Sequence, residues 1–332
     1  MTVRIELAHP HDLIVRYFLM DIELFRSLLE HYGGMGVIRL IDFGSLRCES
    51  PTTIDDHLQE VIGDLRFSAK FKAGGYSKVF FFFEHQSKKV KRFCIRCLRK
   101  LLEFYEGCEA DPNAMTDDGK YPYVFVIVLY HGEIPWNELL QMGDWVSLPP
   151  GADRHFLSFP AILIDLSRIR CEELKGHPAL VALLDTLQSA SLGKLPENFD
   201  RIVGHFEEIK TDPRIYGWLN SLTRYFLAVT KTGKEVITET ISKILNKQEA
   251  EKMVMSTLEE LFVQGEIKGE IKGEIKGRIF VILKILNKRF EKVPESILRS
   301  INSYTDPIAL DSLAELALDC ETLAEFEREL VH

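Results

Sequence analysis

Two carboxylates and an amide stand at positions where they could bind a divalent metal ion. Asp64 begins the β-rich segment 63–72, and Glu84 and Gln86 lie two residues apart near the end of the next β-rich segment, 76–86. Side chains two residues apart on a strand share a face, and paired strands lie about 5 Å apart. Such oxygen ligands suit Mg²⁺, for which Mn²⁺ can substitute, and a bound ion of this kind promotes phosphodiester hydrolysis. The alternative is that Glu84 and Gln86 only mark the solvated end of a strand.

Three further carboxylates are second-tier candidates for the same site. Asp56, next to Asp55, precedes a short helical stretch, and capping of a helix N-terminus is favoured over metal binding there. Asp165 ends a strand-like segment and has the same ambiguity, and Asp12 either contacts the site or caps the first helix. His131 follows a strand-like segment, where a structural hydrogen bond is the favoured role.

A run of basic residues, 88–100, begins two residues after Gln86 and contains no acidic residue. Four of its cations recur at helical spacing and would form one stripe: Lys88, Arg92, Arg96 and Arg99. Charge runs are often only solvated helix faces. In a chain with a net charge of −9, however, this run beside the carboxylates is suited to hold the phosphates of DNA.

The elements that would position these residues follow an α/β order over the first half of the chain. Apolar spacing predicts helices over 13–32 and 88–106 and strands over 63–72, 76–86, 121–132 and 159–166. Ala73-Gly74-Gly75 predicts a hairpin between the first two strands, and Phe80–Phe83 predicts that the second of them is central. Beyond Cys171 the pattern is helical.

A glycine-rich repeat, GEIKGEIKGEIK, occupies residues 265–276. Each glycine inside a helix costs about 1 kcal/mol relative to alanine, and the Glu and Lys rows form no favourable i, i+4 pair. The segment is therefore either a helix stabilised from outside or a flexible linker. As a helix it would expose an apolar stripe that a homodimer could bury. The stripe combines the repeat isoleucines with flanking apolar residues: Leu258, Leu261, Phe262, Ile282, Leu286 and Phe290.

These segments together resemble the recombination-promoting nuclease family, which also includes transposase-like proteins, within the PD-(D/E)XK nuclease superfamily. The matching pieces keep their order from residue 9 to about residue 169: H-D-L-I-V-R at 11–16, Asp64, E-H-Q-S at 84–87, Arg96, V-L-Y-H-G at 128–132 and Asp165. The repeat and the tail behind it resemble the C-terminal module often attached to these nucleases.

The resemblance implies a fold and a set of roles. It implies an α/β, restriction-endonuclease-like core, a mixed sheet flanked by helices, over 1–170. A helical middle region over 171–250 and the repeat-bearing helical module over 251–332 would follow. Asp64 and Glu84 would be metal ligands. Gln86 would take the place of the superfamily's lysine, which orients or activates the attacking water; an amide orients water but carries no charge.

The rest of the sequence excludes several other classes of protein. No apolar run approaches the ~20 residues of a membrane helix, and the charged start lacks the apolar stretch of a signal peptide, so we expect a cytoplasmic protein without a membrane partner. The six cysteines should be free thiols there. Cys94 and Cys97 lack a second ligand pair, so two cysteines on one helix face are favoured over a zinc site.

The function expected from the sequence is that of a Mg²⁺-dependent DNA endonuclease, linked by the resemblance to recombination, mobile elements or phage defence. Intact Asp64 and Glu84 favour the enzyme. One rival is a DNA-binding protein on a degenerate nuclease scaffold, marked by Gln86. Another is an oligomeric interaction protein, for which the repeat is the main argument.

Overall fold

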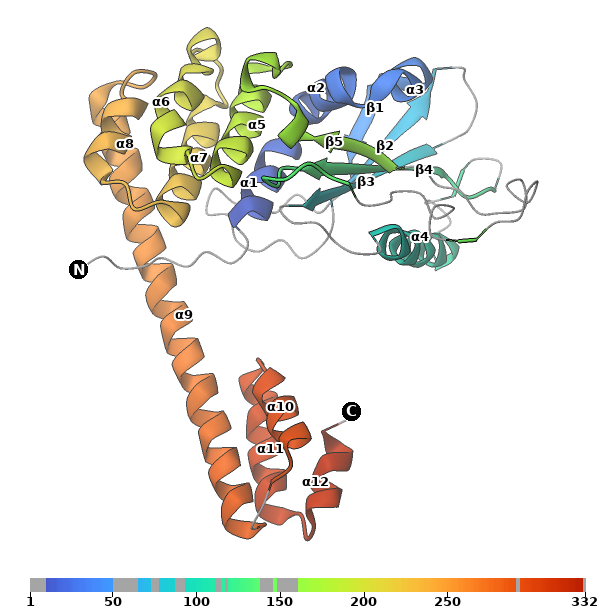
Figure 1. Cartoon of the computed structure of the whole chain (residues 1–332), viewed down its shortest axis with the longest axis vertical. Helices are drawn as coiled ribbons and strands as arrows, with labels where there is room; N and C mark the ends of the chain where they lie inside the picture. The colour runs from blue at the N-terminus through green and yellow to red at the C-terminus, as the bar shows by residue number, and fades with distance from the viewer. Residues whose placement is uncertain are drawn as a thin grey trace. The chain divides into compact units, whose positions relative to one another are not determined.

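The computed structural model describes residues 10–49, 65–72, 78–86, 93–110, 115–116, 119–137, 146–147, 161–290 and 293–330. These residues form two compact units, one ending at Leu258 and the other beginning at Glu259. The first unit combines a mixed sheet with helices (Figure 1), so the expected α/β class with a helical continuation is confirmed. The expected regions 1–170, 171–250 and 251–332 stay a prediction.

The described strands form one sheet whose spatial order follows the chain: β1 (Ile41–Cys48), β2 (Leu65–Phe71), β3 (Lys78–Gln86), β4 (Tyr123–Tyr130) and β5 (Ala161–Asp165). β2 runs antiparallel to both β1 and β3, whereas β3, β4 and β5 are parallel. Parallel strands end at one edge of a sheet, so the carboxyl ends of β3, β4 and β5 lie together.

The predicted hairpin of β2 and β3 is confirmed, with Leu65 opposite Phe83, and β3 occupies the predicted middle position. Strand β1 was not predicted from the sequence. Its pairing with β2 is interrupted between Asp42 and Arg47, and this irregularity breaks the alternation of apolar and polar residues by which a strand is recognised.

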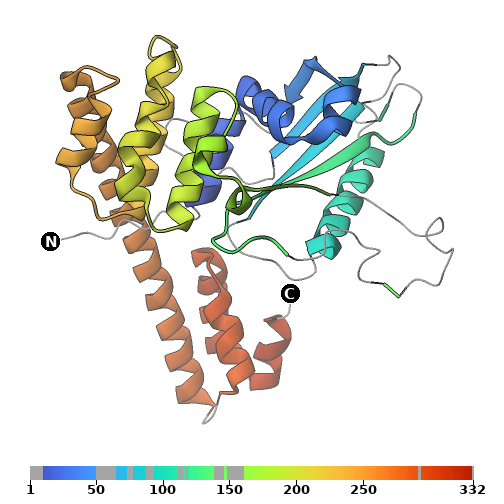
Figure 2. The ribbon, with the colours of Figure 1, turned by 45° about the horizontal axis from the view of Figure 1, so that its top comes forward.

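Helices cover both faces of the sheet (Figures 1 and 2). Helices α1 (Pro10–Leu19), α2 (Ile22–Tyr32) and α5 (Pro178–Ser191) share one core with Ile127 and Leu129 of β4. The short helix α3 (Gly34–Leu40) connects α2 to β1. Helix α4 (Phe93–Ala110) packs on the other face, against Val126, Val128 and Tyr130. Alternate residues of β4 therefore contact different helices.

Two helix predictions need correction. The single helix expected over 13–32 ends at Leu19 and restarts at Ile22, because the Asp21 carboxylate accepts a hydrogen bond from the Glu23 amide (3.0 Å) and caps α2. The helix expected over 88–106 continues past Gly107 to Ala110, because Cys108 extends its buried face. Within the described residues it begins at Phe93; Lys88 and Arg92 lie outside them.

After β5 the first unit is helical, as predicted. Its helices are α5, α6 (Leu195–Gly204), α7 (Ile215–Val229), α8 (Lys234–Ile241) and the start of α9 (Lys247–Arg289), with short 3₁₀ turns at Leu166–Arg168, Cys171–Glu173 and Glu207–Ile209. Helices α5 and α7 pack on α1, and their buried residues belong to the same core as the sheet. None of the described helices combines the length and apolar composition needed to cross a membrane.

The second unit packs the later part of α9 against α10 (Glu295–Ser303), α11 (Pro307–Asp319) and α12 (Leu323–Glu329). The repeat is therefore helical and is not a flexible linker. The expectation of a continuous exposed stripe is wrong in part, because Ile279, Ile282 and Leu286 are buried against the chain's own helices. Ile267 and Ile271 remain 50% and 45% exposed.

Candidate functional site

The carboxyl edge of the parallel strands brings together several of the residues expected from the sequence. Glu84 of β3 pairs with Val128 of β4, and Gln86 pairs with Tyr130, which pairs in turn with Asp165 at the end of β5. Ligands of open α/β sheets bind at such carboxyl edges. For Glu84 and Gln86 the structure describes the strand position, whereas Asp64 and Asp56 lie outside the described residues.

The start of α4 packs against this edge through aromatic rings. The Trp136 ring lies 5.4 Å from that of Phe93 and 5.1 Å from that of Tyr130, both edge to face. The guanidinium of Arg96 lies over the Phe93 ring, 5.3 Å from its centre. Arg96, a member of the basic stripe expected from the sequence, therefore lies next to the carboxyl edge of the parallel strands. Arg99, one turn further, is exposed to solvent.

The Asp165 carboxylate is buried and fully engaged. One oxygen accepts hydrogen bonds from the Trp136 amide (2.9 Å) and Arg168 Nε (3.0 Å), and the other from the amide and hydroxyl of Ser167 (3.1 and 2.6 Å). Burial, followed by the nearby Asp165 charge, raises the pKa of Tyr130. These bonds favour the interpretation of Asp165 as a cap that holds the Trp136 loop; a sequence signal for it is the Ser167-Arg168 pair, which begins two residues after Asp165.

A second polar group lies on the opposite face, where β4 ends beside α1, α5 and α7. The Tyr225 hydroxyl is bonded to His11 Nδ1 (2.7 Å), and His131 Nδ1 to the Ser191 hydroxyl (2.8 Å). The two imidazole rings are 5.1 Å apart. Burial lowers the pKa of His11 and, with the His11 charge, lowers that of His131 to about 3; burial also raises the pKa of Tyr225. The expected structural hydrogen bond of His131 is confirmed.

The sequence did not indicate this arrangement, because Tyr225 lies far from His11 along the chain. Asp12, the neighbour of His11, forms an ion pair with Arg16 (2.8 Å) one helical turn away on α1. Cys94 and Cys97 are buried and lie on one helix, α4, as expected. Among the described residues, no cluster of three or more His, Cys, Asp and Glu side chains could hold a metal ion.

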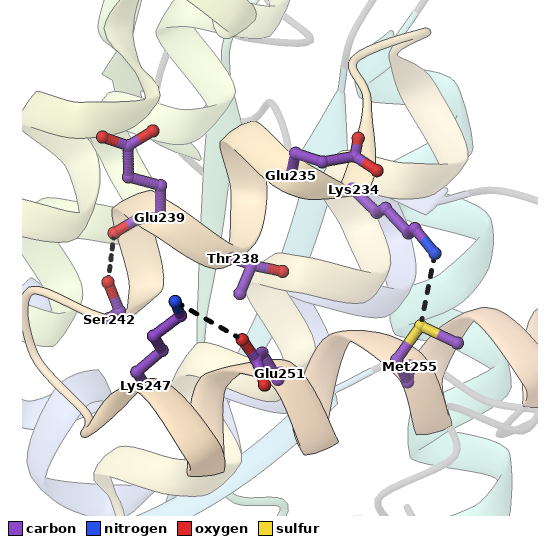
Figure 3. A pocket seen from close by; sticks show the side chains of 8 residues that line it. All are labelled: Lys234, Glu235, Thr238, Glu239, Ser242, Lys247, Glu251 and Met255. Atoms are coloured by element: carbon purple, nitrogen blue, oxygen red, sulfur yellow. Dashed lines mark hydrogen bonds and ion pairs between the residues drawn. The ribbon is translucent and has the colours of Figure 1, made fainter.

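A pocket of about 650 Å³ lies elsewhere in the first unit, between α8 and the first turns of α9 (Figure 3). Its polar groups are engaged locally: Lys247 approaches Glu251 at 4.0 Å, and the Ser242 hydroxyl donates to the Glu239 carbonyl at 2.7 Å. The Lys234 ammonium lies 3.8 Å from the Met255 sulfur. Of these contacts only that of Lys234 with Met255 joins the two helices, and the three together present no converging set of acid and base groups.

Comparison with known families identifies the chain. The family model described as "Putative transposase, YhgA-like" matches residues 9–215, which include the sheet, α4 and the helices that carry His11 and Ser191. The chain belongs to this family. The expectation formed from the residue motifs is thereby confirmed at the level of the family.

Relatives named as nucleases match about half of the chain. Recombination-promoting nuclease RpnC of Escherichia coli (strain K12) is 29% identical over 54% of this chain and 57% of its own length. RpnA of the same strain is 30% identical over 54% and 59%. The chain thus spans a little more than half the length of these relatives.

A relative named inactive matches more of the chain. The inactive recombination-promoting nuclease-like protein RpnE of Escherichia coli (strain K12) is 24% identical over 86% of this chain and 92% of its own length. No solved structure matches the chain.

Proposed function

We propose that this protein is a metal-dependent endodeoxyribonuclease with a PD-(D/E)XK-type core, linked to recombination, mobile elements or phage defence. The observation that carries the proposal is the strand register at the carboxyl edge. Leu65, directly after Asp64 in the sequence, pairs with Phe83, directly before Glu84. The same edge holds the ends of β4 and β5 and the start of α4.

The donor set suits Mg²⁺ or Mn²⁺, because Asp64 and Glu84 supply carboxylates and Gln86 an amide oxygen, the hard ligands these ions prefer. A bound ion would polarise a phosphoryl oxygen and lower the pKa of a water molecule. Gln86 would orient that water through its amide. Arg96, beside the edge, and Arg99 on the exposed side of α4 would hold phosphates.

The match to a relative named inactive, over 86% of this chain, supports one other candidate: a DNA-binding protein on a degenerate nuclease scaffold. Both candidates predict DNA binding. They differ in whether phosphodiester bonds are broken, so the decisive measurement is cleavage.

The test is incubation of the purified full chain with supercoiled plasmid DNA, with Mg²⁺ or with a chelator. Wild-type protein should nick or linearise the plasmid only with the metal ion, and Asp64→Ala and Glu84→Ala should lose nearly all activity while keeping the wild-type melting temperature. Glu197→Ala, which removes an exposed carboxylate on α6, is the matched control. Gln86→Lys should stay active. Metal-dependent binding without cleavage by the wild type would favour the degenerate scaffold, and full activity of Asp64→Ala would show that the site is wrongly assigned.

Self-association through the repeat is a separate part of the proposal. Ile267 and Ile271 are about half exposed on one side of the helix. On the nearly opposite side, a Cβ atom added at Gly265 or Gly269 would contact nothing within 4 Å, so a second backbone could approach that side closely. A homodimer would bury the exposed isoleucines. Ile267→Glu with Ile271→Glu should lower the mass measured by light scattering, whereas Ile308→Glu, at a position 76% exposed on α11, should not. An unchanged mass in the double variant would argue against this interface.

A further inference from the structure

One face of the first two strands carries exposed cations, and among the described residues no helix packs on it. In β2, Leu65, Phe67 and Ala69 are buried in the core shared with α1, α2 and α5. Successive side chains on a strand point to opposite faces, so Arg66 and Lys70 belong to the other face, and both are exposed. The burial pattern thus separates an apolar face from a charged one within a single strand.

Strand β1 extends the charged face. Arg47 is paired with Ser68 and is exposed, and its guanidinium donates to the Leu46 carbonyl (2.7 Å). Two carboxylates belong to the same region, and both are engaged locally. The Asp42 carboxylate accepts from the Gly44 amide (3.0 Å), and the Glu49 carboxylate accepts from the Ser68 hydroxyl. These bonds leave the charge of both carboxylates in place, and Asp42 pairs with Lys70 across the strands. The three cations outnumber them by one, a small positive excess in a chain with a net charge of −9.

Helix α4 lies on the same side of the sheet as these cations, but it packs on β4. Its buried residues cluster with Val126, Val128 and Tyr130 of β4, and in the described part of the chain this cluster contains no residue of β1 or β2. The side of the sheet on which α4 lies, opposite α1, α2 and α5, is visible in Figures 1 and 2. The face of β1 and β2 beside it carries the exposed side chains of Arg47, Arg66 and Lys70.

The row of cations leads toward the strand end that carries Glu84. Arg66 pairs with Phe82, two residues before Glu84, whereas Lys70 pairs with Lys78 at the other end of β3. Four residues of strand span roughly 13 Å. One strand of B-DNA advances about 3.4 Å along its axis per phosphate, so roughly four phosphates match this length.

We propose that the exposed face of β1 and β2 binds the phosphodiester backbone of DNA through Arg47, Arg66 and Lys70 and directs it to the carboxyl edge. This inference rests on the proposed nuclease function. A nucleic acid is the occupant that the charge favours, because the face offers cations and little apolar area. Another β-strand is a less suitable occupant. The irregularity of the edge strand β1, where the Ser45 hydroxyl accepts a hydrogen bond from the Lys70 amide (2.7 Å), opposes strand pairing along β1.

The experiment is fluorescence anisotropy of a short labelled DNA duplex, titrated with the full chain at several salt concentrations in a chelating buffer that prevents cleavage. Arg66→Gln with Lys70→Gln should reduce the slope of log K against log salt by about two relative to the wild type. Between about 50 and 200 mM salt, this corresponds to about a tenfold smaller loss of affinity. Lys194→Gln with Lys231→Gln, which removes the same charge from exposed positions outside the sheet, is the matched control.

Arg66→Lys keeps the charge and should keep the wild-type slope, which separates loss of phosphate binding from disturbance of β2. If the Arg66 and Lys70 double variant has the slope of the control, the inference is overturned, and plasmid cleavage that depends on Asp64 would leave the proposed function intact. If the wild type neither binds the duplex nor cleaves plasmid, the proposed function fails with it.

Discussion

At the carboxyl ends of the parallel strands, polar side chains are buried and hydrogen-bonded to each other on one face of the sheet and lead to solvent on the other face. On the side of α1, α5 and α7, one hydrogen bond joins the side chains of His11 and Tyr225 and another joins those of His131 and Ser191, so that each bond links separate elements. Burial lowers the pKa of both histidines and therefore favours their neutral forms. These are the residue types from which general acids and bases are usually drawn, yet here they connect helices to a strand.

On the side of α4, buried aromatic rings pack beneath basic side chains, and these reach solvent along the helix. Phe93 and Trp136 close the end of β4, Arg96 lies over Phe93, and Arg99 is exposed one turn further on. The exposed cations of β1 and β2 belong to the same side. The comparison shows that residue type alone does not locate chemistry, because the histidines are engaged in structural hydrogen bonds, whereas the exposed cations lie on the α4 side.

The largest expected effect is on plasmid cleavage, which should depend on Glu84 and not on Tyr225 of the histidine side. Glu84→Gln keeps the shape of the side chain but removes its charge, so we expect plasmid cleavage to fall by about 100-fold or more, equivalent to about 2.7 kcal/mol of transition-state stabilisation. Tyr225→Phe removes the hydroxyl bonded to His11 and should cost about 1 to 3 kcal/mol of folding stability, with unchanged cleavage per folded molecule. Cleavage rates and urea unfolding measured on both variants provide the check. Loss of cleavage in folded Tyr225→Phe would move the site to the histidine side.

A smaller effect tests whether Asp165 is a structural cap or a metal ligand. Asp165→Asn weakens the bonds to the Trp136 amide and Arg168, and hydrogen bonds to a charged group contribute about 1.5 to 3 kcal/mol, so we expect a loss of about 2 kcal/mol in urea unfolding. Cleavage should persist in the fraction that remains folded. The opposite pattern, wild-type stability with abolished cleavage, would identify Asp165 as a metal ligand.

The closed histidine cluster also predicts how stability depends on pH. The pKa of His131 falls from 6.5 to about 3 on folding, so between these values the unfolded chain binds a proton that the folded chain does not. This contribution is fully present above about pH 6.5 and is lost as pH falls, by up to about 1.4 kcal/mol per pH unit. Unfolding free energies between about pH 7.5 and 5 should decline less steeply in His131→Gln than in the wild type. Parallel declines would mean that His131 is solvated in the folded protein.

The sequence predicted the parts of the fold that depend on local pattern. The hairpin and the central strand follow from apolar runs and turn glycines, and the structure confirms them. For the repeat the sequence left a helix and a flexible linker open, and the structure shows a helix. Strand β1 and the break at Asp21 were missed, because an irregular strand and a single capping residue leave no periodic signal. At the site, Glu84 and Gln86 were placed at a strand end, and their neighbours on β4 and β5 became known only from the strand register. The pairing of His11 with Tyr225 is a tertiary contact that spacing along the chain does not encode.

The smallest expected effect concerns how far the binding surface extends along α4. Arg99 is exposed on the helix that begins at the carboxyl edge, so a DNA strand crossing β1 and β2 toward Glu84 would reach it only if it continued past the site. In that case Arg99→Gln should lower the slope of log K against log salt by about one, which is about a threefold to fourfold smaller loss of affinity between about 50 and 200 mM salt. Arg299→Gln, at a position where the side chain is 76% exposed, removes the same group from α10 as a control. If Arg99→Gln matches that control while Arg66→Gln with Lys70→Gln lowers the slope, the DNA path ends at the carboxyl edge, and the exposed side of α4 is a solvated helix face.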